Sequence, residues 1–81
     1  MTYMDFLGIN AVQEAWGEVN FGPGADPINT IGRNLVKVAH GYGIGSGAFF
    51  LLDELGLAIN GKNKIKLTEK GFEFLSLPFN K

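Results

Sequence analysis

Side chains that could carry catalytic chemistry are few in this sequence, and their spacing does not assemble an active site. His40 is the single histidine, so a metal site built from several histidines is excluded within one chain. The eight carboxylates are scattered, without the close pair that acid–base catalysis uses. We therefore expect a protein that is not an enzyme and that holds no metal ion.

Two glycine-rich stretches come close to nucleotide-binding motifs. Residues 43–48 read Gly-Ile-Gly-Ser-Gly-Ala and fit a variant of the dinucleotide fingerprint, but the chain after Ala48 has room for scarcely one crossover of the parallel sheet that this motif needs. Residues 56–63 match a P-loop except for the final Ser or Thr, whose hydroxyl would hold magnesium. We expect no nucleotide and no other cofactor.

Basic side chains are the remaining groups that could bind a ligand, and their distribution is uneven. The net charge is −1, yet residues 1–32 carry −4 without any Lys or Arg, whereas residues 33–81 carry +3. Such a polarised chain can orient an approaching polyanion. Lys62, Lys64 and Lys66 alternate along one short segment, and Arg33 and Lys37 are four residues apart, which places them on one side of a helix. Alternating lysines can equally serve as a solvated face that prevents strands from pairing edge to edge.

The chain length limits the scaffold that positions these groups to one domain, residues 1–81, because 81 residues cannot sustain two cores. Cysteine is absent, which suits a reducing compartment and predicts a cytoplasmic location. No apolar run approaches the roughly 20 residues that a bilayer requires. The N-terminus also lacks the basic and apolar regions of a secretion signal, so we expect a soluble protein without a membrane partner.

Apolar spacing and capping residues predict three helices in the first two thirds of the chain. Residues 3–18 are predicted to be helical with a break near Gly8, and we expect this apolar segment to be able to pair two copies across a two-fold axis as a homodimer. Asp26 followed by Pro27 begins a second helix that reaches about His40. Ser46 is expected to cap a third helix over residues 47–55, which Gly56 ends. The side chains expected inside are Ile28, Ile31, Leu35, Val38, Ala48, Leu51, Leu52 and Leu55.

A β-hairpin and a last helix follow. Asn60-Gly61 predicts the hairpin turn, with Ile65 facing the core, the neighbouring lysines facing water, and Ile59 and Ile65 as cross-strand neighbours. Thr68 is expected to cap a helix over residues 69–77 whose Phe72 and Leu75 pack inward.

This order of elements resembles the winged helix-turn-helix superfamily of small DNA-binding regulators. Two helices, a glycine turn, a helix that ends in Leu-Gly-Leu and a hairpin precede the run LTEKGFEFL, residues 67–75, which is similar to the joint between wing and helix in many bacterial and archaeal members. The resemblance covers roughly residues 28–77. It implies a mainly α fold with a small β-hairpin: a three-helix core, a wing and a C-terminal helix.

In that family the helix after the turn enters the major groove of duplex DNA, and the wing contacts phosphates or the minor groove beside it. The resemblance implies that Ser46–Leu55 is the recognition helix and Ala58–Leu67 the wing. However, the positions expected to face outward on this helix, residues 46, 47, 50, 53 and 54, include two carboxylates and no Lys or Arg.

Two interpretations remain open. In the first, a small regulator binds DNA mainly through phosphates, and the contacting residues are Arg33, Lys37, Ser46, Lys62, Lys64 and Lys66. In the second, the domain is a protein-interaction adaptor, for example of phage or plasmid origin, that does not touch DNA. Its binding residues are an aromatic hot spot with an acidic rim: Tyr42, Phe49, Phe50, Asp53 and Glu54. The two phenylalanines can instead belong to the core, as large side chains in small domains often do.

Overall fold

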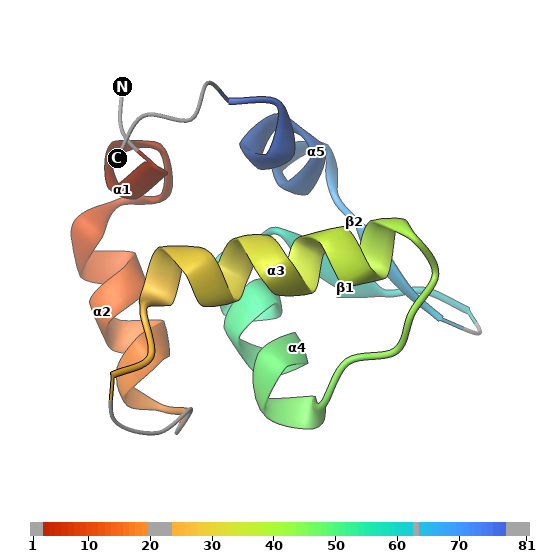
Figure 1. Cartoon of the computed structure of the whole chain (residues 1–81), viewed down its shortest axis with the longest axis horizontal. Coiled ribbons are helices and arrows are strands. Elements are labelled where there is room, and N and C mark those ends of the chain that lie inside the picture. The colour runs from red at the N-terminus through yellow and green to blue at the C-terminus, as the bar shows by residue number, and fades with distance from the viewer. Residues whose placement is uncertain (1–2, 20–23, 63, 78–81) are drawn as a thin grey trace.

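The structure is a computed structural model that describes residues 3–19, 24–62 and 64–77. Within these residues the protein is mainly helical, with one two-stranded antiparallel sheet, as the sequence predicts (Figure 1). In chain order the elements are α1 Tyr3–Leu7, α2 Ile9–Gly17, α3 Pro27–Ala39, α4 Ser46–Glu54, β1 Ala58–Asn60, β2 Ile65–Leu67 and α5 Glu69–Ser76. None of these helices has the length and apolar character needed to cross a membrane.

Helix α3 forms the centre of the molecule. Figure 1 shows it between α4 and α5, with α1 and α2 at one end and the hairpin at the other. The carboxylate of Asp26 accepts a hydrogen bond of 2.8 Å from the amide of Asn29, which confirms the predicted cap. The predicted apolar stripe is also confirmed, since Ile31, Leu35 and Val38 are buried.

Helix α4 packs the predicted face inward but begins one residue earlier than expected. Gly45 is its N-cap and Ser46 its first residue, and no side-chain cap hydrogen bond forms. The prediction that Ser46 caps the helix is therefore wrong, because the extended backbone at Gly45 already turns the chain into the helix. The other end is confirmed: Gly56 adopts a φ of 72°, and the amide of Leu57 donates to the Leu52 carbonyl at 2.8 Å.

At the N-terminal end, the predicted break is confirmed. Gly8 has a φ of 90° and separates α1 from α2. The rings of Tyr3 and Phe6 pack against Phe74 of α5, with ring centroids 4.7 Å and 6.4 Å away. This packing uses apolar surface that was expected to be available for pairing two copies.

The hairpin register differs from the prediction. Ala58 pairs with Leu67, Ile59 with Lys66 and Asn60 with Ile65, so the prediction that Ile59 and Ile65 are cross-strand neighbours is wrong. The amide of Gly61 donates to the Lys64 carbonyl at 2.7 Å, which moves the turn two residues beyond Asn60-Gly61.

The physical reason for this register lies at the base of the hairpin. There the amide of Thr68 donates to the Leu57 carbonyl at 3.0 Å. Leu57 ends the turn that follows α4, immediately before β1, and Thr68 stands immediately before α5. If Leu57 lies opposite Thr68, the next pairs toward the turn are Ala58 with Leu67, Ile59 with Lys66 and Asn60 with Ile65, which is the observed register. The helix caps therefore set the register, and the preference of Asn-Gly for a tight turn does not.

Helix α5 is capped by Thr68, as predicted, through a 3.1 Å hydrogen bond from the Gly71 amide. The prediction that Phe72 packs inward is wrong, because its side chain is 58% exposed and Phe74 is buried instead. Leu75 packs partly against the core, as expected. The docking of α1 decides this orientation, since Tyr3 and Phe6 meet the face of α5 that carries Phe74.

Candidate nucleic-acid interface

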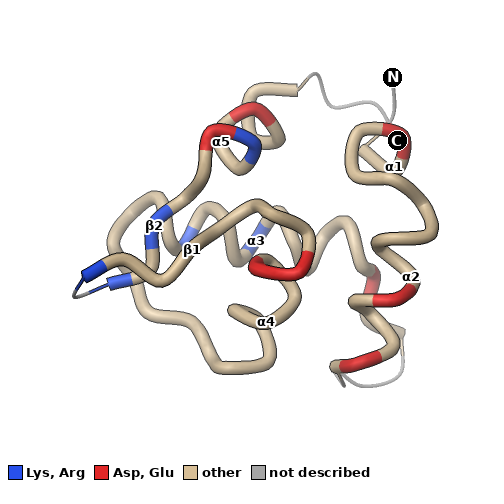
Figure 2. Tube along the Cα trace, turned by 180° about the vertical axis from the view of Figure 1, so that it is seen from behind, with Lys and Arg blue, Asp and Glu red and all other residues tan. Residues whose placement is uncertain are grey.

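The hairpin presents three lysines to solvent at one end of the molecule. Lys66 lies on the outer face of β2, opposite Ile59, and Lys62 and Lys64 lie in the loop that joins the strands. All three are exposed, and no ion pair to a residue described by the structure holds any of them. Figure 2 shows these cations at the hairpin end, farthest from the acidic positions of α2. The ammonium groups are therefore free to meet an external anion.

The sequence-predicted cations of α3 lie in a different place. Arg33 and Lys37 are exposed and line a hollow between α3 and the start of α4, together with Ser46. The polar side chains of Asn29, Thr30 and Asn34 line the same hollow. The first turn of α4, with its unpaired backbone amides, also borders this hollow and could donate to a phosphate. The carboxylate of Asp26 lines the hollow too and would oppose an anion there.

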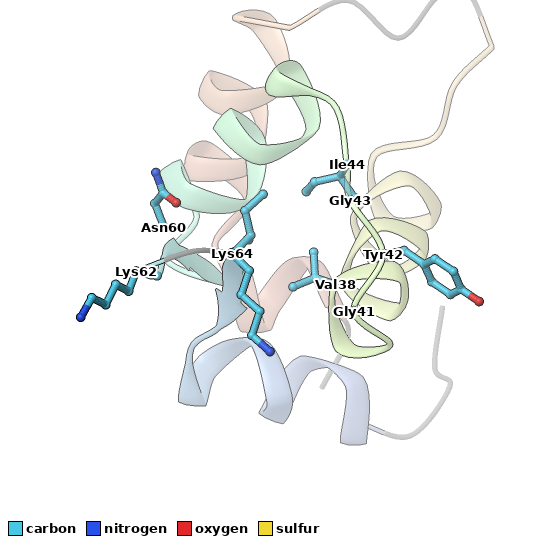
Figure 3. Close-up of a pocket in the computed structure, with 10 residues that line it drawn as sticks. Val38, Gly41, Tyr42, Gly43, Ile44, Asn60, Lys62 and Lys64 are labelled. Carbon is cyan, nitrogen blue, oxygen red and sulfur yellow. The ribbon is translucent and has the colours of Figure 1, made fainter.

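The cations of α3 and the lysines of the hairpin line different hollows. Lys62 and Lys64 line a second hollow, whose other wall is the loop after α3. In Figure 3 the side chains of Val38 and Ile44 line this hollow, whereas Lys62 extends away from the body. The structure therefore brings Arg33, Lys37 and Ser46 together around one hollow, and gathers the three lysines at the hairpin as a separate patch.

The predicted outward positions of α4 are confirmed as exposed. Ser46, Gly47, Phe50, Asp53 and Glu54 are all exposed, so two carboxylates occupy the face that would approach a groove. Phosphate oxygens repel such groups. Direct base contacts from this helix are therefore disfavoured.

The aromatic residues of the adaptor hypothesis do not form one cluster. Tyr42 is 70% exposed, and its ring points away from the hollow that its backbone lines (Figure 3). Phe49 is half-buried. Phe50 is 37% exposed and lies in a groove between α2 and α4, and the residues that line it are Ala11, Glu14, Ala15, Glu18, Phe50 and Glu54.

Three surface features were missed at the sequence level. Ile59 is 52% exposed on the outer face of the hairpin, and Phe72 borders a hollow together with His40, Lys64 and Lys66. Glu14 and Glu18 join Glu54 around Phe50. The i, i+4 spacing of Glu14 and Glu18 was visible in the sequence, but their approach to α4 depends on tertiary packing.

No group of three or more metal-ligating side chains lies close enough to hold a metal ion among the described residues. Comparison of the chain with protein-family models, with curated proteins and with solved structures finds no match.

Proposed function

We propose that this chain is a small winged helix-turn-helix regulator that binds duplex DNA through phosphate contacts. The order of the elements supports the proposal: a helical core formed by α2, α3 and α4, a hairpin in the place of the wing, and α5 after it. The recognition helix would be α4, and its two exposed carboxylates predict little base reading. Binding would then be weak and tolerant of sequence.

The observation that carries the proposal is the projecting hairpin, whose three exposed lysines form no ion pair with any residue that the structure describes and lie away from the acidic positions of α2. Phosphate neutralisation supplies most of the affinity of sequence-tolerant DNA binding. Arg33 and Lys37, beside the N-terminus of α4, would add phosphate contacts from α3.

Fluorescence anisotropy with a labelled DNA duplex at low salt tests this proposal. Replacing Lys62, Lys64 and Lys66 with Ala should abolish binding, because the phosphate contacts are lost together. The logarithm of the association constant falls with the logarithm of the salt concentration, and we call the steepness of this fall the salt slope. A single Lys66→Ala change should reduce the salt slope by about 1, as expected for one lost phosphate contact.

The matched control is Lys70→Ala, which removes the same charge from α5, outside both cationic patches. This variant should keep nearly the wild-type salt slope. Equal losses in the Lys66 and Lys70 variants would show that net charge, and not the hairpin, determines binding, and would contradict the proposal.

A protein-interaction adaptor remains the second candidate, and one observation favours it: the exposed ring of Phe50 lies in a groove with a carboxylate rim. Aromatic anchors inside polar rims carry most of the binding energy in many protein interfaces. If Phe50→Ala lowers the melting temperature markedly, Phe50 belongs to the core and the adaptor hypothesis fails.

A further inference from the structure

The groove between α2 and α4 has an apolar floor and an acidic rim. Ala11, Ala15 and the exposed ring of Phe50 form the floor. Glu14, Glu18 and Glu54 form the rim, and all three carboxylates are exposed. We refer to these six residues as the Phe50 groove.

The electrostatic environment of the Phe50 groove is unfavourable in the isolated chain. Glu14 lies in α2, and Glu18 is the C-cap residue of that helix four positions later, so the two carboxylates repel each other. Glu54 adds a third negative charge from α4. No ion pair with a described Lys or Arg relieves this repulsion. A cationic partner would relieve it.

The hairpin carries the complementary pattern. On its outer face Ile59, 52% exposed, lies directly opposite Lys66, and Lys62 and Lys64 follow in the loop. One exposed aliphatic side chain with three lysines thus matches one exposed aromatic ring with three carboxylates. Apolar contact at the centre and opposite charges at the rim are the arrangement of a specific protein interface.

A hairpin cannot reach the groove of its own chain. Figure 1 places α2 and the hairpin at opposite ends of the longest axis, which measures 32 Å. The hairpin that enters a Phe50 groove must therefore come from a second copy.

We propose that the protein self-associates head to tail, with the hairpin of one copy docked in the Phe50 groove of the next. The inference rests on the second candidate function, since it names the partner of the same groove. Because each copy keeps one free hairpin and one free groove, the contact is heterologous and extends into open chains unless the rotation closes a ring. DNA would compete with this contact, because both use Lys62, Lys64 and Lys66.

Amide shifts in two-dimensional NMR spectra, followed in a dilution series without DNA, test the proposal. Resonances of Ala11–Glu18, Phe50–Glu54 and Ile59–Lys66 should move with protein concentration, and raising the salt concentration should suppress these shifts. Phe50→Ala should weaken association about tenfold. Shifts confined to one of the two surfaces, or no dependence on concentration, would overturn the proposal.

A charge swap provides the sharpest control. Glu14→Lys with Glu18→Lys should abolish self-association, and so should Lys62→Glu with Lys64→Glu. A mixture of the two variants should associate in equal amounts, because the hairpin of the first fits the groove of the second and the reversed charges of the other hairpin and groove also attract each other. Failure of the mixture to associate would overturn the proposal, provided that melting curves show both variants to be folded.

The charge variants also separate this proposal from DNA binding. Glu14→Gln with Glu18→Gln should lose self-association and still bind duplex DNA, since its hairpin is unchanged. A protein that binds DNA but stays monomeric at every concentration contradicts head-to-tail docking alone. A protein that self-associates but does not bind DNA contradicts the DNA-binding proposal alone.

Discussion

Gly71 is the residue whose identity the packing dictates most directly. A Cβ atom at this position would overlap the carbonyl group of Leu57, and Gly71 is buried where α5 meets the start of β1. The atoms that an added Cβ would meet belong to the Leu57 backbone, so no flexible side chain can move aside to make room. A residue with a higher helix propensity than glycine would therefore destabilise the protein at this position.

We predict that Gly71→Ala lowers the free energy of unfolding by about 2 kcal/mol or more, because either α5 or the hairpin must shift. Gly47→Ala is the matched control: Gly47 is also helical, but no atom lies within 4 Å of its added Cβ. This control should raise the stability by up to about 1 kcal/mol. Chemical denaturation measures both, and equal effects would contradict the close approach.

The inward face of α5 could not be predicted from the sequence, whereas that of α3 could. The spacing of Phe72 and Leu75 and the spacing of Gly71, Phe74 and Leu75 are both helical, so the sequence alone does not decide between them. Contacts with α1 decide it, since Tyr3 and Phe6 meet Phe74. In α3 the ambiguity is smaller, because Ile31, Leu35 and Val38 form one helical stripe and the exposed Val36 alone does not form a second one.

At the scale of elements, Thr68 joins the end of α4 to the start of α5. Its hydroxyl donates to the Gly56 carbonyl at 2.6 Å and accepts from the Gly71 amide at 3.1 Å, while its own amide donates to Leu57. One residue therefore caps α5 and fixes the base of the hairpin. The capping role was predictable from the sequence, but the bond to Gly56 was not, since it depends on the αL turn that returns the chain.

Thr68→Ala should cost about 1 to 2 kcal/mol of stability, because it removes the cap and leaves the Gly56 carbonyl without this donor. Thr68→Ser keeps the hydroxyl and should retain most of that stability. Thermal melts of the two variants provide the comparison. A serine variant as unstable as the alanine variant would show that the methyl group, and not the hydrogen bonds, is responsible.

The hairpin illustrates why a strong local signal can place an element correctly and still misplace its turn. Asn60-Gly61 correctly indicated a hairpin, but Asn60 is part of β1 and pairs with Ile65. The Leu57–Thr68 bond at the base sets the register, and Ile59 is exposed as a result. The alternation of apolar and polar residues does not reveal hydrogen bonds between segments that are distant in sequence, so the strand register could not be predicted from it.

At the scale of the whole molecule, the charge separation seen along the sequence persists in space. Figure 2 shows the acidic positions of α2 at one end and the lysines of the hairpin at the other. This polarity was predictable because residues 1–32 carry four carboxylates and no Lys or Arg. The meeting of Glu54 with Glu14 and Glu18 was not, since it requires α2 to pack against α4.

The salt dependence of duplex DNA binding, measured by anisotropy with the wild-type protein, tests the central claim most directly. Three phosphate contacts from the hairpin predict that the logarithm of the association constant falls with the logarithm of the salt concentration with a slope of about −3. A slope of this size in the wild-type protein, together with loss of binding in the triple lysine variant, would support phosphate binding by the hairpin. Absence of any association at low salt, or an affinity independent of salt, would contradict it.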